Sequence, residues 1–323
     1  MRPVSAVAKP AGAVKVRPLE EGDLDAADRI MRVAFGTFRG VPDPSTAFGE
    51  AQIVRTRFRA APEHAWVAEL DGEVVGSVFA TRWGSFGFFG PLTTDPSSWD
   101  RGVGSRLMEP VLETLEGWGL RQAGLFTFPG SPKHIGLYQK FGFWPRFLTT
   151  VTAKPVTGRA GDHATFSEVP AGERAAALVA IRGLTDAVFP GLDLEHEILA
   201  ADLQGIGDTV LLRREGEPEG VAVCHRGAGS EAGGGACYVK FGAVRPGAGA
   251  PDRFERLLDA CESFAADSGL ERLVAGVNTG RLDAYRRMLH RGFRTELIGI
   301  SMRLRPEVAD FDTPDHYVID DLR

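Results

Sequence analysis

A short run of the sequence combines glycines with the start of a predicted helix in a way that could hold a phosphate group. The run reads Pro96-x-x-Trp99-x-x-Gly102-x-Gly104 and lies between a predicted strand and a predicted helix. Glycine lets the backbone approach a phosphate closely, and the first turn of a helix presents free N–H groups and a positive dipole end. Each such contact contributes only about 0.3–1 kcal/mol when exposed, so several must act together. Arg101 and Arg106 could add local positive charge. By itself, the pattern is also that of a plain turn at the entrance of a helix.

The elements around this run must position it. Apolar residues at helical spacing predict an amphipathic helix over 103–118, and Gly119 is placed to cap its end. The pair Asp71-Gly72 predicts a two-residue hairpin upstream. Strands are predicted over 14–17, 66–70, 73–82, 86–92, 123–128 and 147–153, and helices over 24–34, 48–60, 103–118 and 135–141.

The same order of elements returns in the second half of the chain. Pro96 and Pro246 are 150 positions apart, and so are the Gly-Phe pairs at 142–143 and 292–293. An apolar stripe over 254–264 reproduces the amphipathic helix. Matched elements in a matched order indicate a tandem duplication.

The run from Pro96 to Gly104 resembles the acetyl-CoA loop of the GCN5-related N-acetyltransferase (GNAT) superfamily. That loop reads Pro-x-x-Gln/Arg-x-x-Gly-x-Gly/Ala and lies between the fourth strand and the third helix. The proline and both glycines are in register here. Trp99 stands where the family has Gln or Arg, which removes one side-chain donor and leaves the backbone N–H groups in place.

A second signature of the family follows at the proper separation. The family pattern is Asn-x-x-Ala-x-x-Leu-Tyr-x-x-x-Gly-Phe, and this chain reads Ser131-x-x-His134-x-x-Leu137-Tyr138-x-x-x-Gly142-Phe143. Ser131 can still form a hydrogen bond in place of Asn, whereas the family offers no role for His134. Two signatures in order are more specific than either alone, and the resemblance extends over 14–153 and 164–304.

The resemblance implies an α/β (α+β) fold of two tandem GNAT-like domains, each a twisted mixed, mainly antiparallel sheet flanked by helices. It implies acetyl-CoA as co-substrate and no metal. In the family, the tyrosine at the position of Tyr138 protonates the departing CoA thiolate, a suitable role for a phenol of pKa near 10 facing a thiol of pKa near 8.5. Packing under the sheet is the alternative. The resemblance also implies that the fourth strand splays from the fifth, so that backbone groups near Leu92 and Thr94 hold the pantetheine arm and the thioester. The residues expected to bind acetyl-CoA are Leu92, Thr93, Thr94, Trp99, Arg101, Gly102, Val103, Gly104, Ser105 and Ser131.

The second half keeps the pattern of elements and loses the residues of the site. At the offset of 150, Asp252 and Phe254 stand at the positions of the two loop glycines, where a phosphate needs bare backbone. Met288 stands at the position of the tyrosine and has no proton to give. Asn278 follows a strand, as the family asparagine would. We expect a degenerate copy, although the glycines within 247–250 leave weak CoA binding open.

These patterns predict four segments. They are a flexible N-terminal tail over 1–12, a GNAT domain with the acetyl-CoA site over 13–155, a degenerate GNAT-like domain over 163–305 and an acidic C-terminal tail over 306–323. A flexible hairpin loop is predicted over 227–235. The end of the chain, over 311–323, is either solvated or laid along the other domain or a partner subunit.

The acceptor side of the site is less readable. An acceptor amine must lose a proton before it attacks a thioester, and the candidate bases are Glu69, Asp95 and His134. An ordinary surface role is the alternative for each. In the family, the first helix and the loop after it shape the acceptor pocket, and the candidates for a partly aromatic, partly acidic pocket are Phe35, Phe38, Phe48 and Asp43. Packing is the alternative use of those rings.

Composition bounds the class of protein. The 323 residues, 43% of them hydrophobic, suffice for about two globular domains. The net charge of −6 gives no electrostatic reason to expect a nucleic acid, and no apolar run approaches the roughly 20 residues that span a bilayer. The cysteines Cys224, Cys237 and Cys261 lack metal-ligand or redox spacing, which fits buried, reduced thiols in a cytoplasmic protein.

The favoured function is transfer of an acetyl group from acetyl-CoA to a primary amine of a small molecule or peptide, by direct attack in a ternary complex in the N-terminal domain. A homodimer is left open. One alternative is a non-catalytic acyl-CoA-binding sensor or scaffold. Another is a structural interaction module that uses the acidic tail and binds no CoA.

Overall fold

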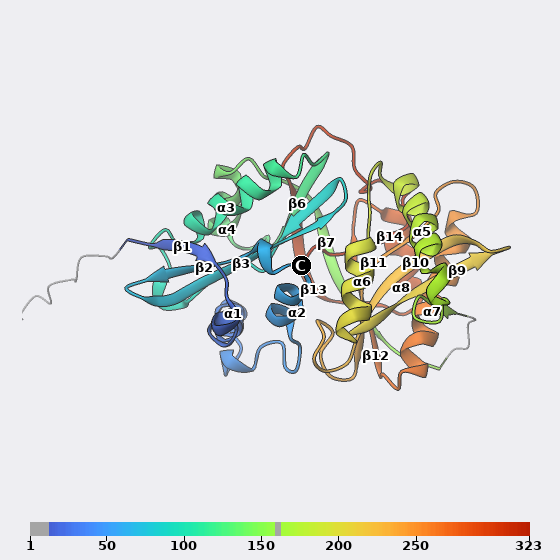
Figure 1. The fold of residues 1–323 in the computed structure, drawn as a ribbon, viewed down its shortest axis with the longest axis horizontal. Coiled ribbons are helices and arrows are strands. Elements are labelled where there is room, and N and C mark those ends of the chain that lie inside the picture. The colour runs from blue at the N-terminus through green and yellow to red at the C-terminus, as the bar shows by residue number, and fades with distance from the viewer. Residues whose placement is uncertain (1–12, 159–162) are drawn as a thin grey trace, which may run out of the picture.

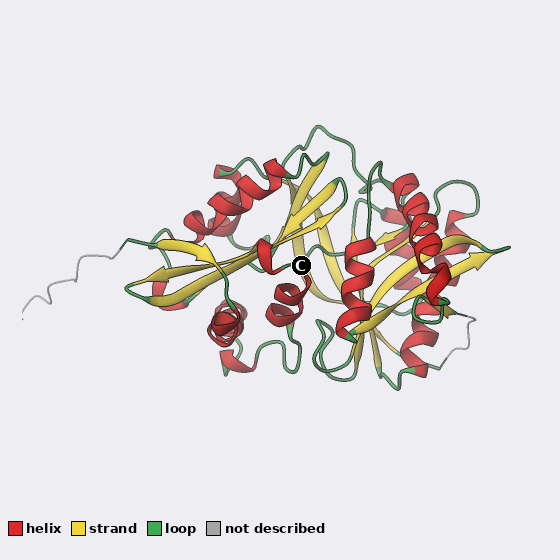
Figure 2. Cartoon of the chain, viewed as in Figure 1, coloured by secondary structure: helices red, strands yellow, loops and turns green. Residues whose placement is uncertain are grey.

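The computed structural model describes residues 13–158 and 163–323, so the predicted tail over 1–12 lies outside the described residues. The chain forms one long twisted sheet with helices packed on both faces (Figures 1 and 2). The predicted α/β fold with a mixed sheet is confirmed. The first half contains β1 (Lys15–Pro18), α1 (Leu24–Arg39), α2 (Ile53–Ala60), β2 (Ala65–Leu70), β3 (Glu73–Trp83), β4 (Phe86–Phe89), β5 (Thr93–Thr94), α3 (Val103–Gly117), β6 (Gln122–Thr127), α4 (Pro132–Lys140) and β7 (Trp144–Pro155). The second half contains β8 (Ala164–Thr165), α5 (Arg174–Val188), α6 (Glu195–Gln204), β9 (Gly207–Arg214), β10 (Glu217–Arg226), β11 (Ala236–Val244), α7 (Ala250–Asp267), β12 (Arg272–Asn278), α8 (Leu282–His290), β13 (Arg294–Arg303) and β14 (Val318–Ile319).

Helices cover the two faces of the sheet in the first half. Leu24 and Met31 of α1 pack with Val54 of α2 against one face of β2 and β3. Leu107 and Val111 of α3 pack against the other face. This division follows from the alternation of β2, whose successive side chains point to opposite faces, and it leaves the start of α3 at the edge where β4 ends.

The two halves exchange their last strands. The strand predicted over 147–153 is present as part of β7, but it does not close a separate sheet of the first half: β7 pairs with β12 of the second half, and β13 lies between β6 and β7. The apolar pattern of a strand specifies that it must pair but not with which edge. The exchange joins both halves into a single sheet.

The predicted duplication has a counterpart in strand register. In the first half β4 pairs in parallel with β6, Phe86 opposite Gln122. In the second half β11 pairs in parallel with β12, Ala236 opposite Arg272. Both pairs keep the offset of 150 that the sequence shows, which supports a common origin of the two halves.

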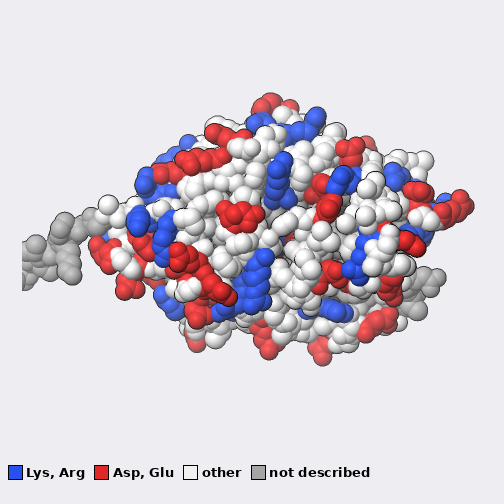
Figure 3. All heavy atoms as spheres, in the orientation of Figure 1, with Lys and Arg blue, Asp and Glu red and all other residues white. Residues whose placement is uncertain are grey.

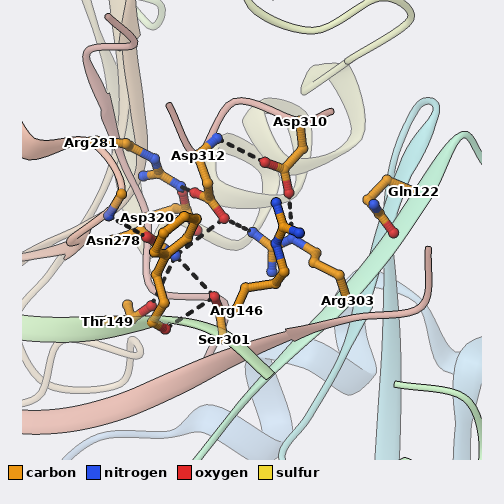
Figure 4. A network of polar contacts seen from close by, with 12 residues as sticks. Gln122, Arg146, Thr149, Asn278, Arg281, Ser301, Arg303, Asp310, Asp312 and Asp320 are labelled. Atoms are coloured by element: carbon orange, nitrogen blue, oxygen red, sulfur yellow. Dashed lines mark hydrogen bonds and ion pairs between the residues drawn. The ribbon is translucent and has the colours of Figure 1, made fainter. Parts of the chain in front are cut away.

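The acidic tail is not solvated, so that alternative is wrong. Asp310, Asp312 and Asp320 are buried and form ion pairs with Arg281 and Arg303, which are also buried (Figure 4). Buried charges require such pairing because desolvation penalises each ion separately. Composition alone could not decide between the two alternatives, because it does not reveal partners that lie elsewhere in the chain.

Asn278 belongs to the same network. Its amide nitrogen contacts Thr149 of β7, donates to Ser301 of β13 at 2.9 Å and donates to Asp312 of the tail at 3.1 Å (Figure 4). The side chain therefore joins both halves and the tail.

A buried histidine makes stability depend on pH. His225 of β10 is 1% exposed, and neither ring nitrogen has a hydrogen-bond partner among the described residues. Burial lowers its pKa from 6.5 to about 4. A histidine with a lowered pKa in the folded state stabilises the fold fully above pH 6.5, and this contribution is lost as the pH falls toward 4. We expect the free energy of unfolding to fall by about 1 kcal/mol from this residue between pH 6.5 and 5.5. Urea unfolding of His225→Gln should show a flatter pH dependence than the parent; a dependence unchanged from that of exposed His290→Gln would contradict the assignment.

On the face of the molecule shown in Figure 3, basic and acidic side chains of the coloured residues are interspersed. Among residues 13–158 and 163–323, no helix has the length and apolar character needed to cross a membrane.

Candidate functional site

A large cavity lies where the two halves meet. Its volume is about 1440 Å³, larger than the roughly 300–1,000 Å³ of common ligand pockets. Every residue predicted to bind acetyl-CoA lines this cavity except Arg101, which is exposed on the loop before α3. Tyr138 lines it as well.

The cavity opens where two central strands separate. The pairing of β4 with β6 ends at Phe88 and Gly124. Beyond that point β6 continues along β13, whereas the chain after β4 turns to form β5, which pairs with β3. The residues of this diverging segment that line the gap are Leu92, Thr93 and Thr94. The expected splay of the strands is therefore present, and it exposes backbone groups to an extended ligand.

The first turn of α3 faces the same cavity. Gly102 is the N-cap residue, with a left-handed φ of 80°, and no side chain of the described residues caps the helix. The N–H groups of the first residues of a helix have no partner inside it. Gly102, Val103, Gly104 and Ser105 all line the cavity. This end of the cavity therefore suits an anionic group.

Trp99 secures the loop before the helix. Its indole nitrogen donates to the carbonyl oxygen of Thr94 at 3.0 Å, so it ties the loop to β5. Lys133 from α4 lies over the indole ring at 5.9 Å and forms an ion pair with Asp100 at 2.5 Å. Lys133 also lines the cavity and supplies a cation near the helix start. The residue that replaces the usual Gln or Arg thus holds the loop.

Ser131 caps α4. Its hydroxyl accepts a hydrogen bond from the backbone N–H of His134 at 3.3 Å. The side chain is buried at the wall of the cavity. It therefore positions α4, the helix that carries Tyr138.

Tyr138 is buried beside Phe89, with ring centroids 5.8 Å apart. Its hydroxyl has no hydrogen-bond partner among the described residues. Burial raises the pKa of the phenol above its ordinary value of 10, so the group stays protonated at neutral pH. An unpartnered hydroxyl in a cavity wall is free to donate to a bound molecule.

Three of the four residues proposed for the acceptor pocket lie at the cavity, and the fourth does not. Phe35, Phe38 and Phe48 line the cavity together with Phe128. Phe38 packs on Phe128 at 4.7 Å and Phe35 on Phe48 at 5.2 Å, so they form one aromatic wall. Asp43 does not line the cavity; it accepts hydrogen bonds from Ser45 in the turn after α1.

The three candidate bases are placed differently. Glu69 pairs with Arg17 at 2.7 Å, and Asp95 accepts from Ser97; neither lines the cavity. His134 does line it, 5.2 Å from the ring of Phe38. Burial, aided by Lys133, lowers the pKa of His134 below 6.5, so its imidazole is neutral at pH 7.

The second half supplies residues that sequence reasoning missed. Glu231 and Tyr238 line the cavity, and so do Leu322 and Arg323 of the tail. Glu231 is held by Arg57 of α2 at 2.9 Å and by Lys240 at 2.6 Å. It lies in the predicted flexible loop, which packs on the first half: the N–H of Gln52 donates to the carbonyl oxygen of Ser230 at 2.8 Å. No local signal marks these residues.

The corresponding helix of the second half begins earlier than expected. α7 has 18 residues against 15 in α3, and its N-cap is Gly249, with φ 81°. The expectation that Asp252 takes the place of the cap glycine is therefore wrong. Pro251, which has no N–H, and the carboxylate of Asp252 still make this helix start unfavourable for an anion.

Comparisons with known proteins bear on the family and on the fold. The sequence model of the acetyltransferase (GNAT) family matches residues 28–143. No curated protein sequence matches the chain. A protein of Pyrococcus horikoshii that is proposed to be an acetyltransferase is similar in structure, with 16% identity over 94% of this chain and 93% of that one, and a TM-score of 0.64. A GCN5-related N-acetyltransferase from Sphaerobacter thermophilus has 15% identity over 93% of this chain and 98% of its own, with a TM-score of 0.59.

A third similar structure is the GCN5-related glucosamine N-acetyltransferase region of a fungal multi-domain GH3 β-N-acetylglucosaminidase. It is 16% identical over 93% of this chain and 39% of that one, with a TM-score of 0.57. At such identities the likeness shows the fold. Residues 28–143 therefore match the acetyltransferase (GNAT) family, and the chain as a whole has the fold of GCN5-related N-acetyltransferases.

Proposed function

We propose that this protein is an N-acetyltransferase that transfers an acetyl group from acetyl-CoA to a primary amine, with the working site in the first half. The observation that carries the proposal is one cavity that unites separated strands, an uncapped helix start and the unpartnered hydroxyl of Tyr138. Acyl-CoA binding needs an anion site at one end of such a groove and room for an extended arm along it, and the cavity offers both.

Acetyl-CoA fits the residues present. The backbone N–H groups at the start of α3 would receive the pyrophosphate, with Lys133 as a nearby cation. Leu92, Thr93 and Thr94 would hold the pantetheine arm. The bound thioester supplies an activated acetyl group; all other steps depend on the side chains of this chain.

The reaction is a direct displacement. The amine nitrogen bonds to the acetyl carbon, the bond between that carbon and sulfur breaks, and the amine proton leaves to a base. Tyr138 donates its hydroxyl proton to the departing sulfur. Burial raises the pKa of Tyr138 and weakens it as an acid. The same apolar wall disfavours a thiolate and so raises the pKa of the CoA thiol as well, which keeps the transfer of the proton from the phenol to the sulfur favourable.

His134 is the best placed of the three candidate bases. Its neutral imidazole lines the cavity beside the aromatic wall. We expect His134→Gln to lower kcat/KM for the amine by about 100-fold, in the range of general base catalysis, with an unchanged acetyl-CoA Kd. The acidic limb of the pH–rate profile should also disappear. A variant that retains this limb would assign the base elsewhere, and exposed His290→Gln serves as the control.

The proposal is tested by release of free thiol from acetyl-CoA in the presence of a panel of primary amines, including glucosamine. Release that depends on both substrates supports the enzyme. The alternative is an acyl-CoA-binding sensor, which the raised pKa of Tyr138 favours because it weakens the acid. Tight acetyl-CoA binding without release for any amine would support the sensor. Absence of binding would exclude both.

A further inference from the structure

The second half repeats the divergence of strands that frames the cavity of the first half, and we call the space between its diverging strands the second cleft. The pairing of β11 with β12 ends at Val239 and Ala275, and β12 then continues along β7 just as β6 continues along β13. In the first half, the gap beyond this point is part of the cavity.

The tail of the chain fills the second cleft. β14 pairs with β11, Val318 opposite Ala243 and Ile319 opposite Gly242. At the offset of 150, residues 242–243 correspond to Leu92 and Thr93, which line the gap in the first half. On the other side of the gap, Asp321 lies so close to Gly276 of β12 that a Cβ there would be 2.4 Å from the Cβ of Asp321. A peptide segment thus lies where an extended arm lies in the proposed site.

Side chains anchor the segment. Tyr317 packs on Phe254 of α7, with ring centroids 5.5 Å apart, and its hydroxyl donates to Asp283 of α8. Arg281 donates to the carbonyl oxygen of Val318 at 2.9 Å and pairs with Asp320 of the tail (Figure 4). The ring of Phe254, which was expected to block a phosphate, is therefore the surface on which Tyr317 of the same chain packs.

The anchored segment continues into the working cavity. Asp321 accepts a hydrogen bond from the hydroxyl of Tyr238 at 2.8 Å, and the guanidinium of Arg323 lies 4.3 Å from the ring of Tyr238. Arg57 of the first half donates to the carbonyl oxygen of Arg323. Leu322 and Arg323 then line the cavity. One segment connects the filled cleft to the wall of the open one.

Leu322 belongs to a hydrophobic cluster against which Phe126 packs, and the cavity wall on the other side of Phe126 is apolar. Val151, Val274 and Leu297 line the same cavity, together with Phe126. Phe126, Val151, Val274 and Leu297 belong to one hydrophobic cluster with Tyr238. An acceptor that extends along this wall is stabilised if the part beyond its amine is apolar, because apolar surface leaves water on binding.

We infer that residues 317–323 are a built-in ligand of the second cleft, and that this anchoring places Leu322 and Arg323 so that they select amines with an apolar body. The second part rests on the proposed function, whereas the occupancy of the second cleft does not. The chain then binds one acyl-CoA, because its own segment occupies the second cleft.

The test uses the full chain and Tyr317→Ala, with Tyr317→Phe as the conservative variant and exposed Leu203→Ala as the control. Calorimetry of the parent with acetyl-CoA should give one site per chain. Hydrogen exchange of the peptide over 313–321 should be at least about tenfold faster in Tyr317→Ala, because the local opening of this segment becomes easier. Tyr317→Phe, which keeps the ring on Phe254, should remain close to the parent.

Two sites per chain, or unchanged exchange in Tyr317→Ala, would overturn the occupancy of the cleft.

If Tyr317→Ala does not fold, Leu322→Ser tests whether the tail selects among acceptor amines. The parent should prefer hexylamine to ethanolamine in kcat/KM, and Leu322→Ser should reduce this preference by about tenfold, in the range of a change in a hydrophobic pocket, with the KM of acetyl-CoA unchanged. An unchanged preference rejects selection by the tail. Absence of thiol release in the parent, with one acetyl-CoA bound and a protected tail, would reject the proposed function alone.

Discussion

Gly102→Asp is expected to weaken acetyl-CoA binding by at least about a hundredfold, equivalent to roughly 2.8 kcal/mol. Gly102 is the N-cap of α3, and its left-handed φ of 80° places the first helical N–H groups in the wall of the cavity. An aspartate at an N-cap accepts hydrogen bonds from the second and third residues of its helix. These are the groups that the pyrophosphate would need, so the new carboxylate competes with the ligand and also repels it.

The substitution should leave the fold intact. A Cβ at Gly102 meets no atom within 4 Å, and aspartate tolerates the left-handed region better than most residues. Gly216→Asp is the matched control, because Gly216 also has a positive φ, of 89°, and open space at its Cβ, but lies in the turn between β9 and β10. Calorimetry should show parental affinity for this control. Parental affinity in Gly102→Asp would place the phosphate site elsewhere, and equal loss in both variants would indicate a general defect.

Local features of the fold could be predicted because they depend on neighbouring residues. Asp71 and Gly72 both adopt positive φ and connect β2 to β3, as their types indicate. The positions that line the cavity in the first half were likewise read from a motif whose members lie within one strand, one turn and two helices. Such motifs allow the local backbone conformation to be predicted, because the residue types within the motif determine it.

Long-range features could not be predicted in this way. The exchange of β7 and β13 depends on which of several free edges each strand meets. Glu231 is paired with Arg57, 174 positions away in the sequence. The tail has the composition of a solvated segment, but its aspartates form ion pairs with buried arginines. Each of these outcomes is decided by partners that no local pattern identifies.

Tyr138→Phe is expected to lower kcat by about 10²–10⁴-fold, the range of general acid catalysis. Tyr138 lines the cavity, and its phenol has no hydrogen-bond partner among the described residues. Without it, the departing sulfur must leave as a thiolate in an apolar wall formed with Phe89 and Leu125, where a charge is poorly solvated. The ring is retained, so packing and the acetyl-CoA Kd should change by less than about twofold.

The pH dependence separates this role from a structural one. Burial raises the pKa of Tyr138, so the parent should keep its acid protonated, and its kcat should not fall, as the pH rises toward 10. An acid with an ordinary pKa would begin to lose its proton in that range. The rate of Tyr138→Phe should instead depend on the leaving group: acyl donors whose thiols have lower pKa values need less protonation and should recover part of the lost rate. Tyr285→Phe on α8, outside the cavity, should behave as the parent. A uniform loss for all donors would mean that Tyr138 only packs beneath the sheet.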